Sequence, residues 1–247
     1  MWSLFSRPEL KFRVAKFRVD RLVSLGALCE AAFQLRRLAR SDRAYPFDWW
    51  ITPLAAVAPV LEAGAGAVFA RERIVKVADY DGAPALYSRL SGTVHLHEFP
   101  AGTDILALDE AEIAARLVPK YDALHGRMER EAAQGTTLFV RQCLPAHDPQ
   151  GEALEEAVDG LYAALSRLAG APLLLLLDYE PVRPRPWLIT ARVPACRDHN
   201  DLGSRRGWNH VFHKAGIAVG RSGGRFGFND LVETFASAPK TKTKSKR

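Results

Sequence analysis

Cys29 combines a reactive side chain with a sequence context that suits covalent chemistry. It follows the segment Ser24–Leu25–Gly26 and precedes an amphipathic stretch at 27–40, so we expect it in the first turn of a helix that follows a strand. A helix N-terminus favours the nucleophilic thiolate through its unpaired N–H groups and its positive dipole end. The alternative is that Cys29 is a small buried residue between helix and sheet.

The turn before Cys29 has a composition that suits a catalytic loop. Gly26 permits a tight bend and the close approach of a substrate. Backbone N–H groups in such a turn are placed to hold an oxyanion. We therefore expect Ser24 and Gly26 to bind substrate or to support the nucleophile.

A cysteine nucleophile requires a base, which is most often histidine. His95 and His97 lie two residues apart in the strand-like segment TVHLHEF, so we expect their side chains on one face. Asp104 opens a second strand-like segment, DILAL, and Asp109 follows it. Either acid could orient a histidine and so complete a set of nucleophile, base and orienting group.

The His-x-His spacing has two further interpretations. It occurs in metal sites, but the additional ligands available here are Cys143, His147 and His199, which have no recognisable ligand spacing. Alternatively, one of the two histidines is a buried residue with satisfied hydrogen bonds. We expect neither a metal nor a cofactor.

Pro46–Phe47–Asp48–Trp49 has the composition of an anchored turn. Proline and aspartate favour the turn, and the aromatic residues anchor it in the core. In a functional interpretation, Asp48 hydrogen-bonds the loop that carries Cys29, and Trp49 or Trp50 lines a substrate cleft.

The elements that must position these residues alternate between strand and helix. The continuously apolar segment at 172–177 predicts a strand buried on both faces, and strand–helix–strand order implies right-handed parallel crossovers. We expect a single α/β domain over residues 1–239, with a mixed, mostly parallel sheet flanked by helices. A papain-like α+β arrangement is the alternative. The expected strands are 10–19, 20–26, 93–99, 104–108, 137–143, 172–177 and 187–193. The expected helices are 27–40, 52–63, 109–135, 154–170 and a short one near Trp208.

Composition and charge limit the function classes. The 247 residues are 48% hydrophobic, which is enough for one sizeable core, and no apolar run is long enough to cross a bilayer. The N-terminal segment lacks the uninterrupted apolar stretch of a secretory signal, and the three cysteines have no zinc-site spacing. Both observations favour a reducing, cytoplasmic setting.

The net charge of +6 comes mostly from the end of the chain. Residues 240–247 (KTKTKSKR) hold five of the 34 Lys and Arg residues and no acid, so the rest has 29 basic and 28 acidic residues. We expect a disordered, solubilising tail and no specific nucleic-acid partner. A nucleic-acid binder that uses this tail and the repeated KFRV within 10–19 is the alternative.

SLGALCEAAFQLRRL followed by YPFDWWITP resembles a bacterial family of unknown function described as papain-like cysteine peptidases. The resemblance covers about residues 20–145. The matching residues are Ser24, Leu25, Gly26, Cys29, Arg36, Pro46–Trp49, His97–Glu98–Phe99, Lys120–Tyr121 and Phe139–Val140–Arg141. The family usually has Asp where this chain has Glu98, and it has an adjacent arginine pair where this chain has the separated Arg127 and Arg130.

The resemblance implies a dyad of Cys29 and His97 in a cysteine peptidase or a related thiol-dependent amide hydrolase or acyltransferase. We favour Asp104 over Asp109 as third member, because a hairpin would return Asp104 close to His97. Ser24, Gly26, Asp48, Trp49 and His95 are the expected substrate-binding or supporting residues, and the partner is a peptide or another acyl or amide substrate. The alternative is a non-catalytic module of the same fold that binds a glycan or a peptide.

Overall fold

A four-stranded parallel sheet forms the centre of the fold. The computed structural model describes residues 16–100 and 102–220 of the chain. The strands follow the order β2-β7-β8-β9, and every neighbouring pair is parallel. Their bounds are β2 (Arg21–Ser24), β7 (Thr137–Gln142), β8 (Leu173–Leu177) and β9 (Leu188–Ala191).

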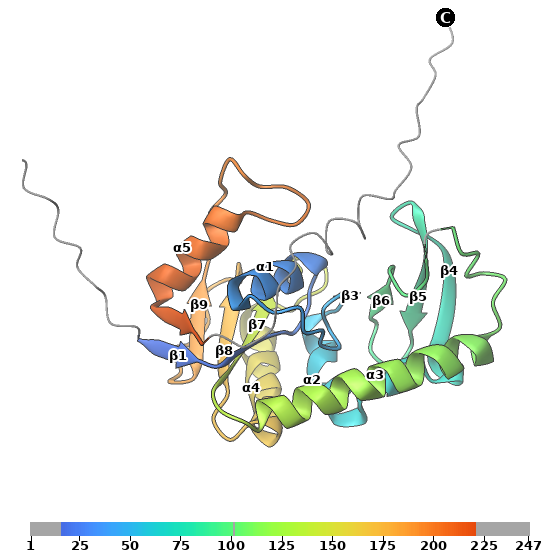
Figure 1. Cartoon of the computed structure of the whole chain (residues 1–247), viewed down its shortest axis with the longest axis horizontal. Helices are drawn as coiled ribbons and strands as arrows, with labels where there is room; N and C mark the ends of the chain where they lie inside the picture. The colour runs from blue at the N-terminus through green and yellow to red at the C-terminus, as the bar shows by residue number, and fades with distance from the viewer. Residues whose placement is uncertain (1–15, 101, 221–247) are drawn as a thin grey trace, which may run out of the picture.

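Helices cover both faces of this sheet (Figure 1). On one face, α1 (Cys29–Ala39) and α5 (Arg205–Ala215) pack against Val140, Leu175 and Leu177. On the other face, α2 (Leu54–Ala63) and α4 (Gly151–Leu168) share a core with Leu174 and Leu176. Successive leucines of β8 therefore enter opposite cores, which is why an unbroken apolar run forms this strand.

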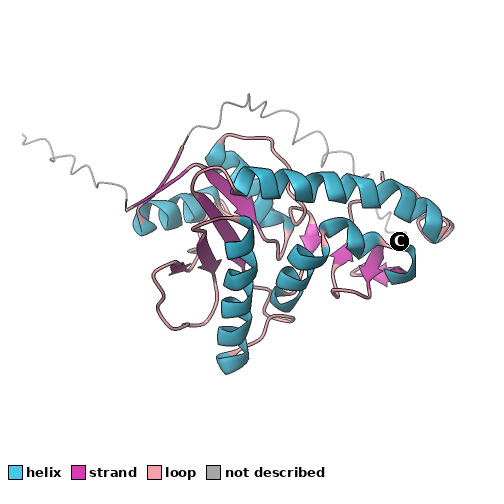
Figure 2. Ribbon diagram, turned by 90° about the horizontal axis from the view of Figure 1, so that it is seen from below, coloured by secondary structure: helices cyan, strands magenta, loops and turns pink. Residues whose placement is uncertain are grey.

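A second, antiparallel sheet lies at the other end of the molecule. Its order is β3-β6-β5-β4, and Figure 2 shows its strands as a group separate from the parallel sheet. The long helix α3 (Glu110–Ala132) extends along both parts and packs against the short 3₁₀ segment Ala65–Phe69 (Figure 1). The strands are β3 (Trp50–Ile51), β6 (Val94–His95), β5 (Ala83–Ser88) and β4 (Ile74–Tyr80).

The two sheets meet at the turn that precedes Cys29. Ala27 forms a parallel bridge with Ile51 of β3, directly beyond the end of β2. A further parallel pair, β1 (Phe17–Val19) with β10 (Ile217–Val219), lies beside the start of β2.

The α/β class with mixed parallel and antiparallel pairing is confirmed. Within the described ranges, no helix combines the length and apolar character needed to cross a membrane.

Several expected elements differ from the structure. The segment 93–99 contributes only the two residues of β6, and 104–108 forms turns instead of a strand. Helix α2 begins at Leu54 with Pro53 as N-cap, so the expected range 52–63 starts two residues too early. The hairpin of β4 and β5 was not anticipated. The tail at 240–247 and the first copy of KFRV lie outside the described residues.

Candidate functional site

A left-handed turn connects β2 to α1. Leu25 continues the pairing of β2 through its N–H to the carbonyl of Val140 at 2.9 Å. The chain then turns at Gly26 (φ +77°) and Ala27 (φ +47°), and α1 begins at Cys29. A Cβ on Gly26 would lie 3.2 Å from Thr52 Oγ1, so glycine is required by both its backbone angle and the space. Positive φ at Ala27 is uncommon and is typical of strained functional turns.

Cys29 is a half-buried free thiol at the start of α1. Burial raises its pKa above the usual value, its own backbone N–H lowers the pKa, and the negative charge of Asp48 adds a smaller increase. The expected stabilisation of the thiolate by the helix N-terminus is therefore outweighed by desolvation. At neutral pH the resting group is a thiol, so its reaction requires a base.

Asp48 joins the Pro46–Trp49 turn to α1. Its carboxylate accepts hydrogen bonds from Arg36 Nη2 at 2.5 Å and from the Tyr45 N–H at 2.9 Å. Burial raises the pKa of Asp48, and the charge of Arg36 opposes that rise. We expected Asp48 to bind the loop that carries Cys29, but it binds the helix two turns further along. The Arg36 guanidinium also lies over the Trp49 ring, 5.1 Å from its centroid.

The aromatic residues of the turn anchor it as expected. Phe47 and Trp50 are fully buried and meet edge to face, with ring centroids 5.4 Å apart. Trp49 is half-buried and belongs to the surface beside α1. The turn therefore has a core side, which carries Phe47 and Trp50, and an outer side, which carries Trp49.

His95 is part of the core of the antiparallel sheet. Its ring lies 4.6 Å from the rings of both Trp50 and Phe69, and its Nε2 is 2.9 Å from Thr93 Oγ1. Burial, with a smaller contribution from Lys120, lowers its pKa to about 3. His95 is therefore neutral at physiological pH and inaccessible to a substrate.

His97 has a different environment because β6 ends at His95 and the chain then bends. The side chain of His97 is exposed, so the expected common face for the two histidines is wrong. The strand pairing connects this segment to the turn before Cys29: Val94 pairs with Ile51, which bridges Ala27. Strand β3 thus lies between the β2–α1 turn and the segment that carries His95 and His97.

Glu98 fastens the segment after His97 to α3. Its buried carboxylate accepts hydrogen bonds from Lys120 Nζ at 2.7 Å and from the Tyr121 hydroxyl. Glu98 and the pair Lys120–Tyr121 lie in separate segments of the family motif, and the structure brings these segments into contact. The segment that carries His97 is therefore held on α3 by charge-assisted hydrogen bonds to the buried Glu98 carboxylate.

Both candidate acids make local backbone hydrogen bonds. Asp104 is exposed, and its Oδ1 accepts the Leu106 N–H at 3.1 Å within a turn. Asp109 caps α3 by accepting the Ala111 N–H at 2.6 Å. The hairpin that favoured Asp104 is absent, since 104–108 forms turns, and its part in a triad stays a prediction.

A buried ionic network that the sequence did not reveal supports the β2–α1 turn. Arg141, at the end of β7, donates two hydrogen bonds to Asp148, at 2.8 and 2.9 Å. It also donates to the Leu25 carbonyl at 3.2 Å and to the Tyr179 hydroxyl at 3.0 Å. Asp148 in turn accepts the Leu54 N–H at 2.6 Å at the start of α2. The network ties β2, β7 and α2 together behind Cys29.

The metal interpretation of the His-x-His segment finds no support in the part of the chain that the structure describes. There, no three side chains of His, Cys, Asp or Glu gather where they could hold an ion. Cys143 packs against the core at the end of β7, where burial raises its pKa.

The comparisons with known proteins identify a family. No curated protein and no solved structure matches the chain. The family model with the description "Putative papain-like cysteine peptidase (DUF1796)" matches residues 20–157, which is more than half of the chain. The match includes the β2–α1 turn, the Pro46–Trp49 turn, the histidine segment and the pair of Arg141 and Asp148. The chain therefore belongs to this family.

Proposed function

We propose that this protein is a cysteine hydrolase in which Cys29 attacks the carbonyl carbon of an amide. The observation that carries the proposal is the position of Cys29 as first residue of α1, after a left-handed turn at the carboxyl end of a parallel strand. The first N–H groups of a helix have no intrahelical partners, so those of α1 are donors for the oxyanion. Family membership supports the same reaction class.

His97 is the proposed base. The raised pKa of Cys29 means that the proton must leave as the thiol attacks, and an exposed imidazole is suited to accept it. The imidazolium then protonates the leaving amine, which departs and leaves an acyl thioester on Cys29. Water, deprotonated by His97, hydrolyses the thioester and restores the thiol. Asp104 is the proposed orienting group for His97. Thioester and ester substrates would react through the same acyl thioester on Cys29, and in acyl transfer another acceptor would take the place of water.

His95 is unsuited to the role of base because its lowered pKa makes it a weak proton acceptor and because it is buried and hydrogen-bonded to Thr93. We assign it to the support of β6 against Trp50 and Phe69. Ser24 and Gly26 have a supporting role in the turn, where the Gly26 N–H donates to Ser24 Oγ at 3.1 Å.

A non-catalytic binding module is the second candidate. The raised pKa of Cys29 favours it, because the resting thiol is a weak nucleophile. In this case the half-buried Trp49, with Arg36 over its ring, would hold a glycan or a peptide.

p-Nitrophenyl acetate separates the two candidates, because it is an acyl donor that needs no peptide recognition. In the proposed enzyme, intact-mass analysis finds one acetyl group on Cys29, with steady release of nitrophenol. Cys29→Ala abolishes the adduct, and His97→Ala slows acylation by a factor of about 10² to 10⁴. His213→Ala, which removes an exposed histidine of α5, is the matched control and leaves the rate unchanged. Equal acetylation of Cys29, Cys143 and Cys196 would refute the nucleophile.

A further inference from the structure

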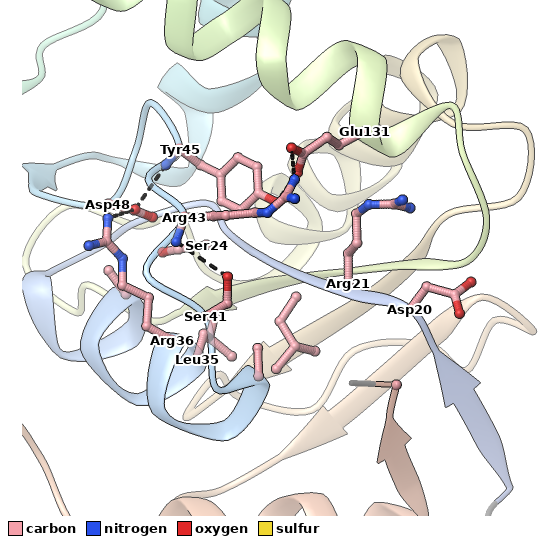
Figure 3. Close-up of a pocket in the computed structure, with 14 residues that line it drawn as sticks. Asp20, Arg21, Ser24, Leu35, Arg36, Ser41, Arg43, Tyr45, Asp48 and Glu131 are labelled. Carbon is pink, nitrogen blue, oxygen red and sulfur yellow. Dashed lines mark hydrogen bonds and ion pairs between the residues drawn. The ribbon is translucent and has the colours of Figure 1, made fainter. Parts of the chain in front are cut away.

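A pocket of about 300 Å³ lies between α1 and the edge of the parallel sheet (Figure 3). Its walls come from β2, from the face of α1 that carries Ala32 and Arg36, from the loop before β3, from Glu131 near the end of α3, and from Gly220 after β10. Cys29 is one helical turn before Ala32. The pocket therefore extends along α1 toward the candidate nucleophile, and its size is at the lower end for ligand sites.

The floor of the pocket is the edge of β2 that faces away from β7. β2 is the terminal strand of its sheet, and the N–H of Leu25 points to β7. In a parallel ladder, alternate residues direct their backbone groups to opposite edges, so those of Leu22 and Ser24 point away from β7. Both residues line the pocket. Among the described residues, no strand pairs with β2 on this side.

The pocket also contains the Arg21 guanidinium, which has no counterion among the described residues. Arg36 is paired with Asp48, and Arg43 with Glu131. Arg21 makes no ion pair within the described chain, and its buried Nη1 has no hydrogen-bond partner. The neighbouring carboxylate of Asp20 instead accepts the Thr136 N–H at 2.8 Å. A partly buried guanidinium with an unsatisfied donor favours an anionic group from a ligand.

We propose that this pocket binds an extended peptide segment that pairs with the outer edge of β2 and directs an acidic side chain to Arg21. The strand edge offers alternating donors and acceptors that match a peptide backbone, and Arg21 supplies the charge complement. A strand bound along Leu22 and Ser24 continues toward the Gly26–Ala27 turn and Cys29. The proposal rests on the proposed function, since it names acidic peptides as the substrate class of Cys29.

Fluorescence anisotropy with the full-length Cys29→Ala variant tests the proposal without turnover. The probes are fluorescein-labelled Ala-Val-Glu-Val-Ala and the same peptide with Gln in place of Glu. We expect the Glu peptide to bind about tenfold more tightly, in line with one charge-assisted hydrogen bond. Arg21→Gln removes this preference. Arg18→Gln retains it, because Arg18 is an exposed arginine of β1 that does not line the pocket.

Two N-methylated probes test the strand pairing. Each carries methyl groups on alternate amides, so only one of them blocks the amides that face β2. We expect one probe to lose binding at least tenfold and the other to retain it. Equal loss for both probes, or a Glu preference that survives Arg21→Gln, would overturn the proposal. Absence of binding to full-length protein together with binding after removal of residues 221–247 would assign the edge to the chain's own C-terminal segment and also overturn it.

The two proposals fail separately. If the Cys29→Ala variant binds the Glu peptide but wild-type protein forms no acyl adduct with p-nitrophenyl acetate, the pocket is a peptide site without hydrolysis. If the adduct forms and Arg21→Gln changes neither binding nor cleavage of Glu-containing peptides, the hydrolase stands and the acidic-peptide assignment is wrong.

Discussion

Asp48 and Arg36 form an ion pair at 2.5 Å that joins the Pro46–Trp49 turn to the helix that begins with Cys29. Both side chains are largely buried, at 3% and 12% exposure. Two segments of the family motif thus form one structural unit, and the position of Cys29 depends on a contact two turns away along α1.

Asp48→Ala should destabilise the fold by about 3–5 kcal/mol, because it leaves the Arg36 charge buried without a partner. Urea unfolding measures the change. Glu62→Ala is the matched control, since its ion pair with Arg167 is exposed and contributes less than about 1 kcal/mol. Similar losses for the two variants would show that Arg36 and Asp48 contribute no more than a surface pair.

Gly26→Ala should destabilise the protein by about 1–2 kcal/mol, because the new Cβ meets Thr52 Oγ1 at 3.2 Å and the residue keeps a positive φ. It should also slow acylation of Cys29, because the turn that positions the thiol shifts. Gly160→Ala is the control: this glycine lies within α4 with open space around it, so alanine should stabilise by about 0.5–1 kcal/mol. Unchanged stability in Gly26→Ala would contradict the strain argument.

The β2–α1 turn was predictable from sequence because its determinants are local. A glycine before an amphipathic stretch and a cysteine at the first helical position define it without knowledge of the rest. The apolar strands β7 and β8 were predictable for a similar reason, since residues buried on both faces give continuous apolar runs.

The strand expected at 104–108 shows where local patterns fail. DILAL is apolar, but only Ile105 is buried, and Leu106 is 42% exposed. Asp104 binds the backbone two residues ahead and stabilises a turn in place of a strand. Apolar composition alone therefore could not separate a strand from an anchored turn.

The pair of Arg141 and Asp148 could not be predicted either. Arg141 is a charged residue in an apolar strand, which marks it as unusual. Its hydrogen-bond partners, however, lie in three different loops, which follow β2, β7 and β8. The position of β2 at the end of its sheet likewise depends on the strand order, which local sequence does not encode.

His95 should make the protein sensitive to acid. Its folded-state pKa of about 3 is below its unfolded value of about 6.5, so between these values the unfolded chain binds an extra proton. Its contribution to stability is present above pH 6.5 and is lost as pH falls, at up to about 1.4 kcal/mol per unit. His95→Gln should give a flatter dependence between pH 6.5 and 4 in urea unfolding. An unchanged slope, with His213→Gln as control, would show that other groups cause the acid sensitivity.

The rate of Cys29 alkylation should still rise with pH at values where an ordinary thiol has already reached its maximum rate. Burial and the charge of Asp48 raise its pKa, so the thiolate fraction at pH 7 is small and increases about tenfold per unit below the midpoint. Iodoacetamide labelling, followed by peptide mass spectrometry from pH 6 to 10, measures the midpoint against free cysteine. Asp48→Asn should lower it, because the repelling charge is gone. A rate that is already at its plateau below pH 7 would instead indicate a preformed thiolate–imidazolium pair, and would replace general-base activation by His97 with an ion-pair mechanism.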